Sequence, residues 1–255
     1  MSGAVCRTSI EGSDNLGCFL PAVNGADIQM EVDKGLKVVG DILSCSKKEL
    51  ESRAFLLDKF LEYGIPVMDS PIFASFRGNM NAAGFGPIQF PTEFIDLLRR
   101  LISLQVKSAL EIGTFRGGAA YFMAAVLQRA CADFSLTMVD PIDNLLGFSK
   151  FAARLRLVKS IPSTSEAYRG RKFDFVFIDG AHDFESVMRD FENVGKFALK
   201  AIACHDIHGH EFDSLDGGTV KAWDVIKEKL RLECEVCEYA HSAERSLGIG
   251  VAIRC

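Results

Sequence analysis

Acidic residues stand at the predicted ends of four apolar segments in this 255-residue chain. Glu111, Asp140, Asp179 and Asp206 each fall at or near the carboxyl end of a segment that we expect to be a buried strand. In an open α/β sheet, these ends border one crevice in which ligands bind. A single carboxylate there has a simple explanation as a helix N-cap. Four in register predict a binding and reaction site, because an unpaired buried charge is costly.

The first of these acids precedes a glycine turn. Residues 107–127 are KSALEIGTFRGGAAYFMAAVL, which predicts a short strand, a break at Gly113 and then a buried helix. The spacing Gly-x-x-x-Gly-Gly differs from the G-x-G-x-x-G of dinucleotide-binding proteins. Glu111 would repel a pyrophosphate but could hold a cationic group, and Asp140 suits two hydrogen bonds to a ribose diol. The pattern therefore points away from NAD and towards S-adenosylmethionine.

Four of the five histidines follow within a short distance of Asp179. Asp179, His205 and Asp206 are expected to end adjacent parallel strands, close enough to share one divalent cation. Oxygen-rich ligation of this kind suits Mg²⁺ or Mn²⁺, whereas more imidazole would favour a transition metal. His208 is the first candidate for a general base and His182 the second. Two alternatives stay open: His182 could only fix the Asp179 loop, and His208 and His210 could be solvated loop residues.

The elements that position these residues alternate between strand and helix. This pattern predicts an α/β fold with a doubly wound, mostly parallel, seven-stranded sheet. The last two strands are joined by a connection so short that an antiparallel hairpin is expected. The predicted strands are 109–112, 135–139, 155–158, 172–178, 201–204, 233–239 and 248–253. The predicted helices are 28–43, 46–64, 93–103 with Thr92 as its cap, the segment after the glycine turn, 185–199 and 219–232.

The first part of the chain differs from the rest. We expect an N-terminal helical or lid region over residues 1–91 and the cofactor-binding domain over residues 92–255. Residues 1–28 show no firm pattern. Residues 65–91 are rich in proline and glycine, lack a period and are too apolar for a linker, which is typical of a lid or binding loop. Its polar candidates for contact with an acceptor are Arg77, Asn79 and Asn81.

Composition limits the class of partner. The net charge is -5 and no run of Lys or Arg exceeds two residues, which argues against nucleic acid as the main partner. No signal-peptide core or membrane-length apolar stretch is present. The eight cysteines are scattered, and Cys234 and Cys237 form a C-x-x-C without a second pair, so a zinc site is not expected. We expect a reduced, cytoplasmic protein that acts on a small molecule, and homo-oligomerisation stays open.

The residues resemble the class I S-adenosylmethionine-dependent methyltransferases. ALEIGTFRGG is similar to their glycine motif, E/D-x-G-x-x-x-G. The closer resemblance is to the branch with cephalosporin-hydroxylase-like proteins and macrolide-sugar O-methyltransferases. It is carried by FDFVFIDGAHDFESVMRDFENV (173–194), CHDIHG (204–209) and GTVKAWDVIKE (218–228), and it covers roughly residues 88–253. One departure is FALKA (197–201), where the family usually has Pro-Gly-Gly before the fifth strand.

The resemblance implies a Rossmann-like methyltransferase fold and a role for each site residue. Glu111, Gly113 and Gly117 would contact the methionine part of the cofactor, Asp140 its ribose, and the segment with Ser163 its adenine; Asp179 is also expected among the cofactor contacts. A metal on Asp179, His205 and Asp206 would hold the acceptor hydroxyl, while His208 or His182 takes the proton. The expected reaction is metal-assisted O-methylation of a small hydroxylated, sugar-like acceptor. Two alternatives are a non-catalytic cofactor-binding or partner-binding module and an NAD-dependent oxidoreductase.

Overall fold

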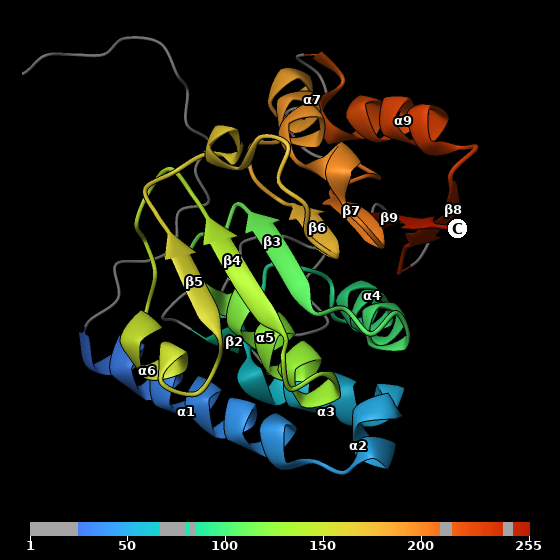
Figure 1. Cartoon of the computed structure of the whole chain (residues 1–255). Helices are drawn as coiled ribbons and strands as arrows, with labels where there is room; N and C mark the ends of the chain where they lie inside the picture. Colours follow the sequence, from blue (N-terminus) through green and yellow to red (C-terminus); the bar gives the residue numbers. More distant parts are fainter. Residues whose placement is uncertain (1–24, 67–79, 82–84, 210–215, 242–246) are drawn as a thin grey trace, which may run out of the picture.

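A seven-stranded sheet forms the centre of the molecule, a computed structural model that describes residues 25–66, 80–81, 85–209, 216–241 and 247–255. Its strands follow the order β5-β4-β3-β6-β7-β9-β8 (Figure 1). In chain order they are β3 (Ser108–Ile112), β4 (Ser135–Val139), β5 (Leu157–Ser160), β6 (Phe175–Ile178), β7 (Ala201–His205), β8 (Cys234–Tyr239) and β9 (Ile249–Arg254). Strands β3 to β7 pair in parallel, whereas β9 runs antiparallel to β7 and β8. The predicted sheet and hairpin are confirmed.

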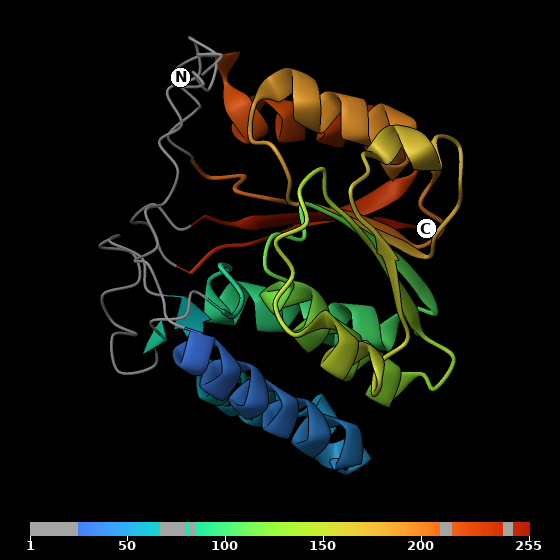
Figure 2. The same ribbon diagram turned by 90° about the vertical axis from the view of Figure 1, so that its left-hand side faces the viewer.

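Helices cover both faces of this sheet (Figure 2). One face carries α1 (Gly25–Ser44), α2 (Lys47–Glu51), α3 (Arg53–Tyr63), α4 (Pro91–Ser103), α5 (Gly118–Ala130) and α6 (Phe148–Ala152). The other carries α7 (Phe184–Asn193), α9 (Gly218–Leu230) and the 3-10 turns η2 (Ser165–Tyr168) and η3 (Gly195–Phe197). This is the predicted doubly wound arrangement. A separate parallel pair, β1 (Ile65–Pro66) and β2 (Met80–Asn81), lies outside the main sheet.

The N-terminal helices share a core with the sheet. The ring of Phe60 in α3 packs edge-on against Phe94 of α4 and Phe122 of α5, with centroids 5.9 and 5.2 Å away. One buried apolar cluster joins side chains of α1, α3, α4 and α5 to those of β3, β4 and β6. The predicted N-terminal helices are therefore present and rest on the sheet. The domain boundary at residues 91/92 stays a prediction.

The second predicted helix is two helices. The capping box at its start is confirmed, because Glu49 N donates to Ser46 Oγ at 3.2 Å and Ser46 N donates to Glu49 Oε2 at 2.7 Å. At Ser52 the backbone becomes extended, and the Ser52 hydroxyl accepts from Phe55 N and caps α3. Apolar periodicity does not show this break, because it records which positions are apolar and not where the backbone leaves the helical conformation.

The predicted cap of the next helix is wrong. Helix α4 begins at Pro91, and its N-cap is Phe90, whose side chain makes no capping bond. Proline suits the first helical turn because it lacks an N–H that the helix would leave unpaired. Thr92 instead places its hydroxyl 3.1 Å from Nδ1 of His241 in the β8–β9 connection.

Smaller differences concern the ends of elements. The strand predicted at 155–158 runs from Leu157 to Ser160, and the one predicted from residue 172 begins at Phe175. Helix α7 stops at Asn193 and gives way to η3, which forms the turn before β7 at the place where the family resemblance breaks down. Helix α6 and turn η2 have no counterpart in the sequence prediction. Within the described ranges, no helix combines the length and apolarity needed to span a membrane.

Candidate active site

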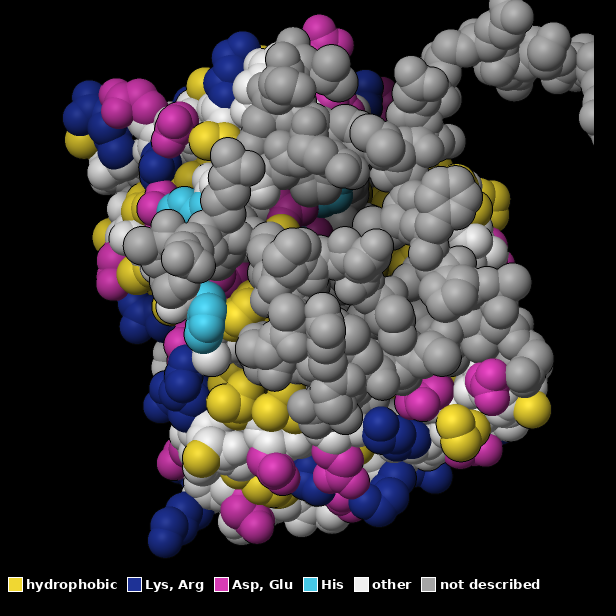
Figure 3. Space-filling model, turned by 180° about the vertical axis from the view of Figure 1, so that it is seen from behind, with side chains coloured by type: hydrophobic (Ala, Val, Ile, Leu, Met, Phe, Trp, Pro, Cys, Tyr) yellow, Lys and Arg dark blue, Asp and Glu magenta, His cyan; other side chains and the backbone are white. Residues whose placement is uncertain are grey.

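A cavity of about 720 Å³ opens at the carboxyl ends of the parallel strands. It is lined by the loops that follow β3, β4, β5, β6 and β7 and by the segment that precedes α4. Seen from behind, acidic and histidine side chains meet in a hollow of the surface (Figure 3). The predicted site residues that line the cavity are Gly113, Asp140, Ser163, Asp179, His182, His205 and Asp206. The sequence therefore locates the crevice correctly.

Two backbone N–H groups hold the carboxylate of Asp140. Phe115 N donates to its Oδ2 at 2.9 Å, and Ile142 N donates to its Oδ1 at 2.8 Å. Its own carbonyl accepts from Ser163 N at 2.8 Å, which ties the β4 loop to the β5 loop. Each carboxylate oxygen has a second lone pair. The side chain is therefore held ready for two further donors, as a ribose diol requires.

The glycine turn packs against two other backbone segments. Gly113 has φ +89, and a Cβ there would lie 2.0 Å from the carbonyl oxygen of Asp179. A Cβ on Gly118 would lie 2.2 Å from Gly86, in the segment before α4. Contacts within the protein therefore require glycine at both positions. The predicted role of this turn, close approach of a ligand to its backbone, remains a prediction for Gly113 and Gly117.

Glu111 lies beside the cavity and is not among the residues that line it. Alternation along β3 places it on the α5 face with Ala109, where it is 1% exposed. Neither of its carboxylate oxygens has a hydrogen-bond partner in the described structure, and the same is true of the Tyr121 hydroxyl in α5. Burial raises the pKa of Glu111 well above its ordinary value, and Asp179 and Asp140 raise it further. Its contact with the cofactor stays a prediction.

The predicted metal residues come together at one end of the cavity. One side-chain ligand atom from each of Asp179, His205 and Asp206 lies within 4.8 Å of the other two. His205 is 4% exposed and places Nδ1 2.9 Å from Asp179 Oδ1 and 3.5 Å from Asp206 Oδ1. Burial alone would lower its pKa, but Asp206 and Asp179 raise the pKa to about 9. Asp206 has φ +59, a left-handed conformation that is uncommon for a residue other than glycine.

Two further side chains fix these acids. His182 lines the cavity and its Nδ1 lies 2.9 Å from Asp206 Oδ2. Burial alone would lower the pKa of His182, but the hydrogen bond and the charge of Asp206 raise it. Gln89, in the segment before α4, donates its Nε2 to Asp179 Oδ2. Gln89 is 3% exposed, and sequence reasoning missed it; the only sign was one amide between Ile88 and Phe90 in an apolar stretch.

His208 lies elsewhere. It is exposed, is not among the cavity-lining residues, and packs so close to β9 that a Cβ on Gly248 would meet its Cδ2 at 2.3 Å. Its backbone N–H donates to Leu247 O at 3.1 Å. His210, Arg77, Asn79 and the side chain of Asn81 fall outside the described residues.

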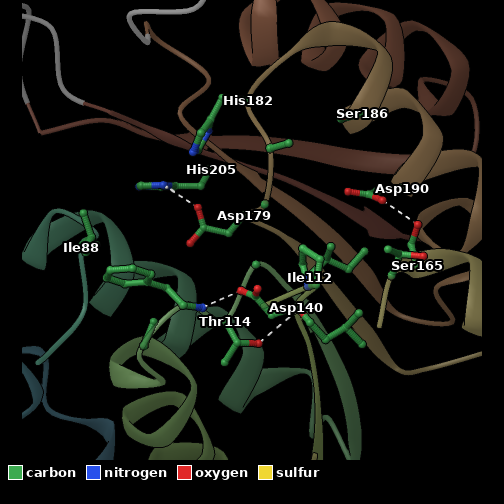
Figure 4. A pocket seen from close by; sticks show the side chains of 18 of the residues that line it. Ile88, Ile112, Thr114, Asp140, Ser165, Asp179, His182, Ser186, Asp190 and His205 are labelled. Carbon is green, nitrogen blue, oxygen red and sulfur yellow. Dashed lines mark hydrogen bonds and ion pairs between the residues drawn. The ribbon is translucent and has the colours of Figure 1, made fainter. Parts of the chain in front are cut away.

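The opposite end of the cavity carries a second buried network. Ser165 donates its hydroxyl to Asp190 Oδ1 at 2.6 Å, and Asn193 Nδ2 donates to Ser165 Oγ at 2.9 Å. Burial raises the pKa of Asp190, and the hydrogen bond from Ser165 offsets part of that shift. Figure 4 shows this pair on the right, the Asp179 and histidine group on the left, and Asp140 between them. The prediction included Ser163 at this end but not Asp190.

Comparison with solved structures supports the fold. The O-methyltransferase from Bacillus cereus in complex with SAH is 16% identical, with 89% of this chain and 100% of that chain covered and a TM-score of 0.52. A candidate caffeoyl-CoA O-methyltransferase from Staphylococcus aureus is 17% identical, with 80% and 99% covered and a TM-score of 0.51. Cofactor-bound Rv0187 from MTB is 14% identical, with 92% and 99% covered and a TM-score of 0.50. At these identities the likeness shows the fold alone.

Comparison of the sequence is more specific. No curated protein matches the chain. Residues 110–207, however, match the family model of a methyltransferase domain. The match runs from β3 to the end of β7 and contains the loops that carry Asp140, Asp179 and Asp206. The matched segment forms most of the cavity and the surrounding fold is that of the solved methyltransferases, so residues 110–207 are similar to a methyltransferase domain.

Proposed function

We propose that the protein transfers a methyl group from S-adenosylmethionine to a hydroxyl group of a small molecule, with the help of a divalent cation. The observation that carries the proposal is the group of Asp179, His182, His205 and Asp206 at one end of the cavity. Asp140, whose geometry suits a ribose, lies between this group and Asp190 (Figure 4). A methyl donor whose ribose is bound at Asp140 would face the acid and histidine group.

The metal-site residues fit a divalent cation. They offer two carboxylates and one imidazole, a set that matches Mg²⁺ or Mn²⁺ better than softer metals. His205 Nε2 is buried without a partner in the described structure, so this nitrogen has a lone pair or proton that a ligand could satisfy. A bound cation would act as a Lewis acid that lowers the pKa of the acceptor hydroxyl.

Within this proposal, His182 replaces His208 as the first candidate base. His182 lines the cavity, whereas His208 does not. Asp206 accepts from the Nδ1 side of His182, which places the lone pair of the neutral imidazole on Nε2. Nε2 would take the hydroxyl proton while the acceptor oxygen forms its bond to the methyl carbon. The carbon–sulfur bond breaks, and its electron pair stays on sulfur to leave S-adenosylhomocysteine.

The acceptor would enter from the side of the segment before α4. Gly86, Ile88 and Gln89 line the cavity, and they belong to the stretch from residue 65 to 91 for which the sequence predicts a binding loop. Positioning of the acceptor over the sulfonium supplies much of the rate in such a displacement. These residues, together with the rest of the N-terminal region, are proposed to select a small hydroxylated, sugar-like acceptor.

Methyl-tritiated S-adenosylmethionine offers a direct test. The intact protein would be incubated with sugar and phenolic acceptors and with amine counterparts, with Mg²⁺, Mn²⁺ or EDTA, while calorimetry measures binding of S-adenosylhomocysteine. We expect cofactor binding without metal, and labelled product from hydroxyl acceptors only with metal. Label transfer to amines alone, or transfer that EDTA leaves unchanged, would contradict metal-assisted O-methylation. Cofactor binding with no transfer to any acceptor would favour a non-catalytic module.

A further inference from the structure

Asp190 in α7 is a buried carboxylate that no step of the proposed reaction uses. It lies at the end of the cavity away from the histidine group (Figure 4). Its Oδ1 accepts the hydroxyl of Ser165, which in turn accepts from Asn193 Nδ2. This chain of donors fixes the direction of the bonds: amide N–H to serine oxygen, serine O–H to carboxylate. Asp190 is therefore held in one orientation by side chains behind it.

Its second oxygen is the one that remains for a ligand. No described residue donates to Asp190 Oδ2, and Figure 4 shows one carboxylate oxygen of Asp190 bonded to Ser165 and the other on the opposite side. Asp190 Oδ2 is not among the fully buried atoms that lack a partner in the described structure, so it opens to the cavity, where a donor of a ligand can reach it. Gly180 of the β6 loop lies close by, since a Cβ there would be 3.8 Å from Oδ2.

The position of Asp190 relative to Asp140 indicates which part of the cofactor lies there. The carbonyl of Asp140 accepts from Ser163 N, and two residues later Ser165 bonds Asp190. Residues 163 to 165 of the β5 loop therefore connect the backbone of Asp140, whose carboxylate is the proposed ribose acceptor, to the side chain of Asp190. The base of an adenosyl group extends from its ribose, and the β5 loop carries the residues expected near the adenine.

We propose that Asp190 is a specificity-determining residue whose Oδ2 accepts a hydrogen bond from the exocyclic amino group of the adenine. The inference depends on the cofactor of the methyltransferase domain and not on the acceptor, the metal or O-methylation. A carboxylate can only accept while it is ionised. It favours an amino group over the carbonyl oxygen that hypoxanthine carries at the same position, because two acceptors would then face each other.

The test compares S-adenosylhomocysteine with S-inosylhomocysteine, in which a carbonyl replaces that amino group. Calorimetry on the full chain would give both affinities for the wild type and for Asp190→Asn. We expect the wild type to prefer the adenosyl compound by about tenfold or more, the range of a hydrogen bond to a charged group. In Asp190→Asn the oxygen can still accept from Ser165 while the amide N–H₂ faces the cavity, so the preference should collapse or reverse.

Glu166→Gln is the matched control, since Glu166 also lines the cavity, sits in η2 next to Ser165, and is exposed. It removes the same charge and should keep the wild-type ratio of the two affinities. If the wild type binds the adenosyl and inosyl compounds equally well, the proposal is wrong. This outcome needs no variant, so it does not depend on whether Asp190→Asn folds. An unchanged ratio in a folded Asp190→Asn, checked by its thermal unfolding, would show that Asp190 only ties α7 to the β5 loop.

Discussion

The two ends of the cavity hold their carboxylates in different ways. On the side that we propose binds the adenosyl group, which we call the adenosyl end, Asp140 accepts two backbone N–H groups and Asp190 accepts a serine hydroxyl. All of these donors are neutral. At the other side, which we propose is the reaction end, Asp206 and Asp179 face the imidazoles of His182 and His205. Those partners exchange protons.

This difference separates two kinds of binding. Neutral donors hold a carboxylate in place without cancelling its charge, which leaves it ready for hydroxyl and amino groups of a ligand. Titratable partners make the charge of the reaction end depend on protons, and a cation can replace those protons. The comparison predicts that changes at one end should alter cofactor binding with little effect on the metal, and that changes at the other end should do the reverse.

A substitution of Gly113 should weaken binding of both the cofactor and the metal, because the backbone of Gly113 lies against that of Asp179. We expect Gly113→Ala to destabilise the fold by about 3 kcal/mol, from left-handed strain plus overpacking against a carbonyl. Gly170→Ala is the control. Gly170 has φ +73, and a Cβ at this position would meet nothing within 4 Å, so strain alone should cost about 1 kcal/mol. Urea unfolding gives both values, and equal losses would contradict the close approach.

Asp206→Asn should separate the ends most clearly. The change removes a metal-ligand candidate and the carboxylate that orients His182. We expect Mn²⁺ affinity to fall about 100-fold and methyl transfer to fall at least as far, in the range of lost general-base and ligand contributions. Binding of S-adenosylhomocysteine should stay within about twofold of the wild type. Calorimetry with Mn²⁺ and with S-adenosylhomocysteine measures the two affinities. An equal loss of cofactor affinity would contradict the independence of the two ends.

Asp140→Ala should give the opposite pattern. It removes the proposed ribose acceptor and leaves Phe115 N and Ile142 N without their partner. Affinity for S-adenosylhomocysteine should fall by about tenfold to a hundredfold, while Mn²⁺ affinity is retained. Asp143→Ala is the control on the same loop, because Asp143 pairs with Lys159 away from these N–H groups. If the control weakens the cofactor as much, the loop charge and not the ribose contact would be responsible.

The sequence predicts the framework of this site better than its fine geometry. Alternating strands and helices place Asp140, Asp179 and Asp206 at one edge, because the carboxyl ends of parallel strands coincide. The side to which a residue points near a strand end is harder to infer. Glu111 is two residues before the turn and points into the α5 face, and His208 is two residues past Asp206 and turns towards β9.

Residues that complete the site from other elements escape local patterns. Asp190 looks like an exposed helix acid in sequence, yet α7 packs against η2 and buries it beside Ser165. Gln89 acts on Asp179, ninety residues away. Such contacts follow from how α4 and α7 pack beside the strand ends, and no spacing rule encodes that packing. The split at Ser52 and the start of α4 at Pro91 are local features instead, and the sequence prediction missed them because it relied on apolar periodicity and on Thr92 as a cap.

Gln89→Leu tests the smallest of the effects expected at the reaction end. Leucine keeps the bulk of the side chain but removes the amide that donates to Asp179 Oδ2. We expect Mn²⁺ affinity to fall by about tenfold, the lower range for loss of a group that orients a metal ligand. Cofactor affinity should be unchanged, because the hydrogen bonds that hold Asp140 and Asp190 do not involve Gln89. Gln89→Glu sharpens the result, because it places a second negative charge beside Asp179. Tighter Mn²⁺ binding in this variant would mean that position 89 contacts the cation itself. Mn²⁺ binding as weak as in the leucine variant would confirm that the amide acts through Asp179.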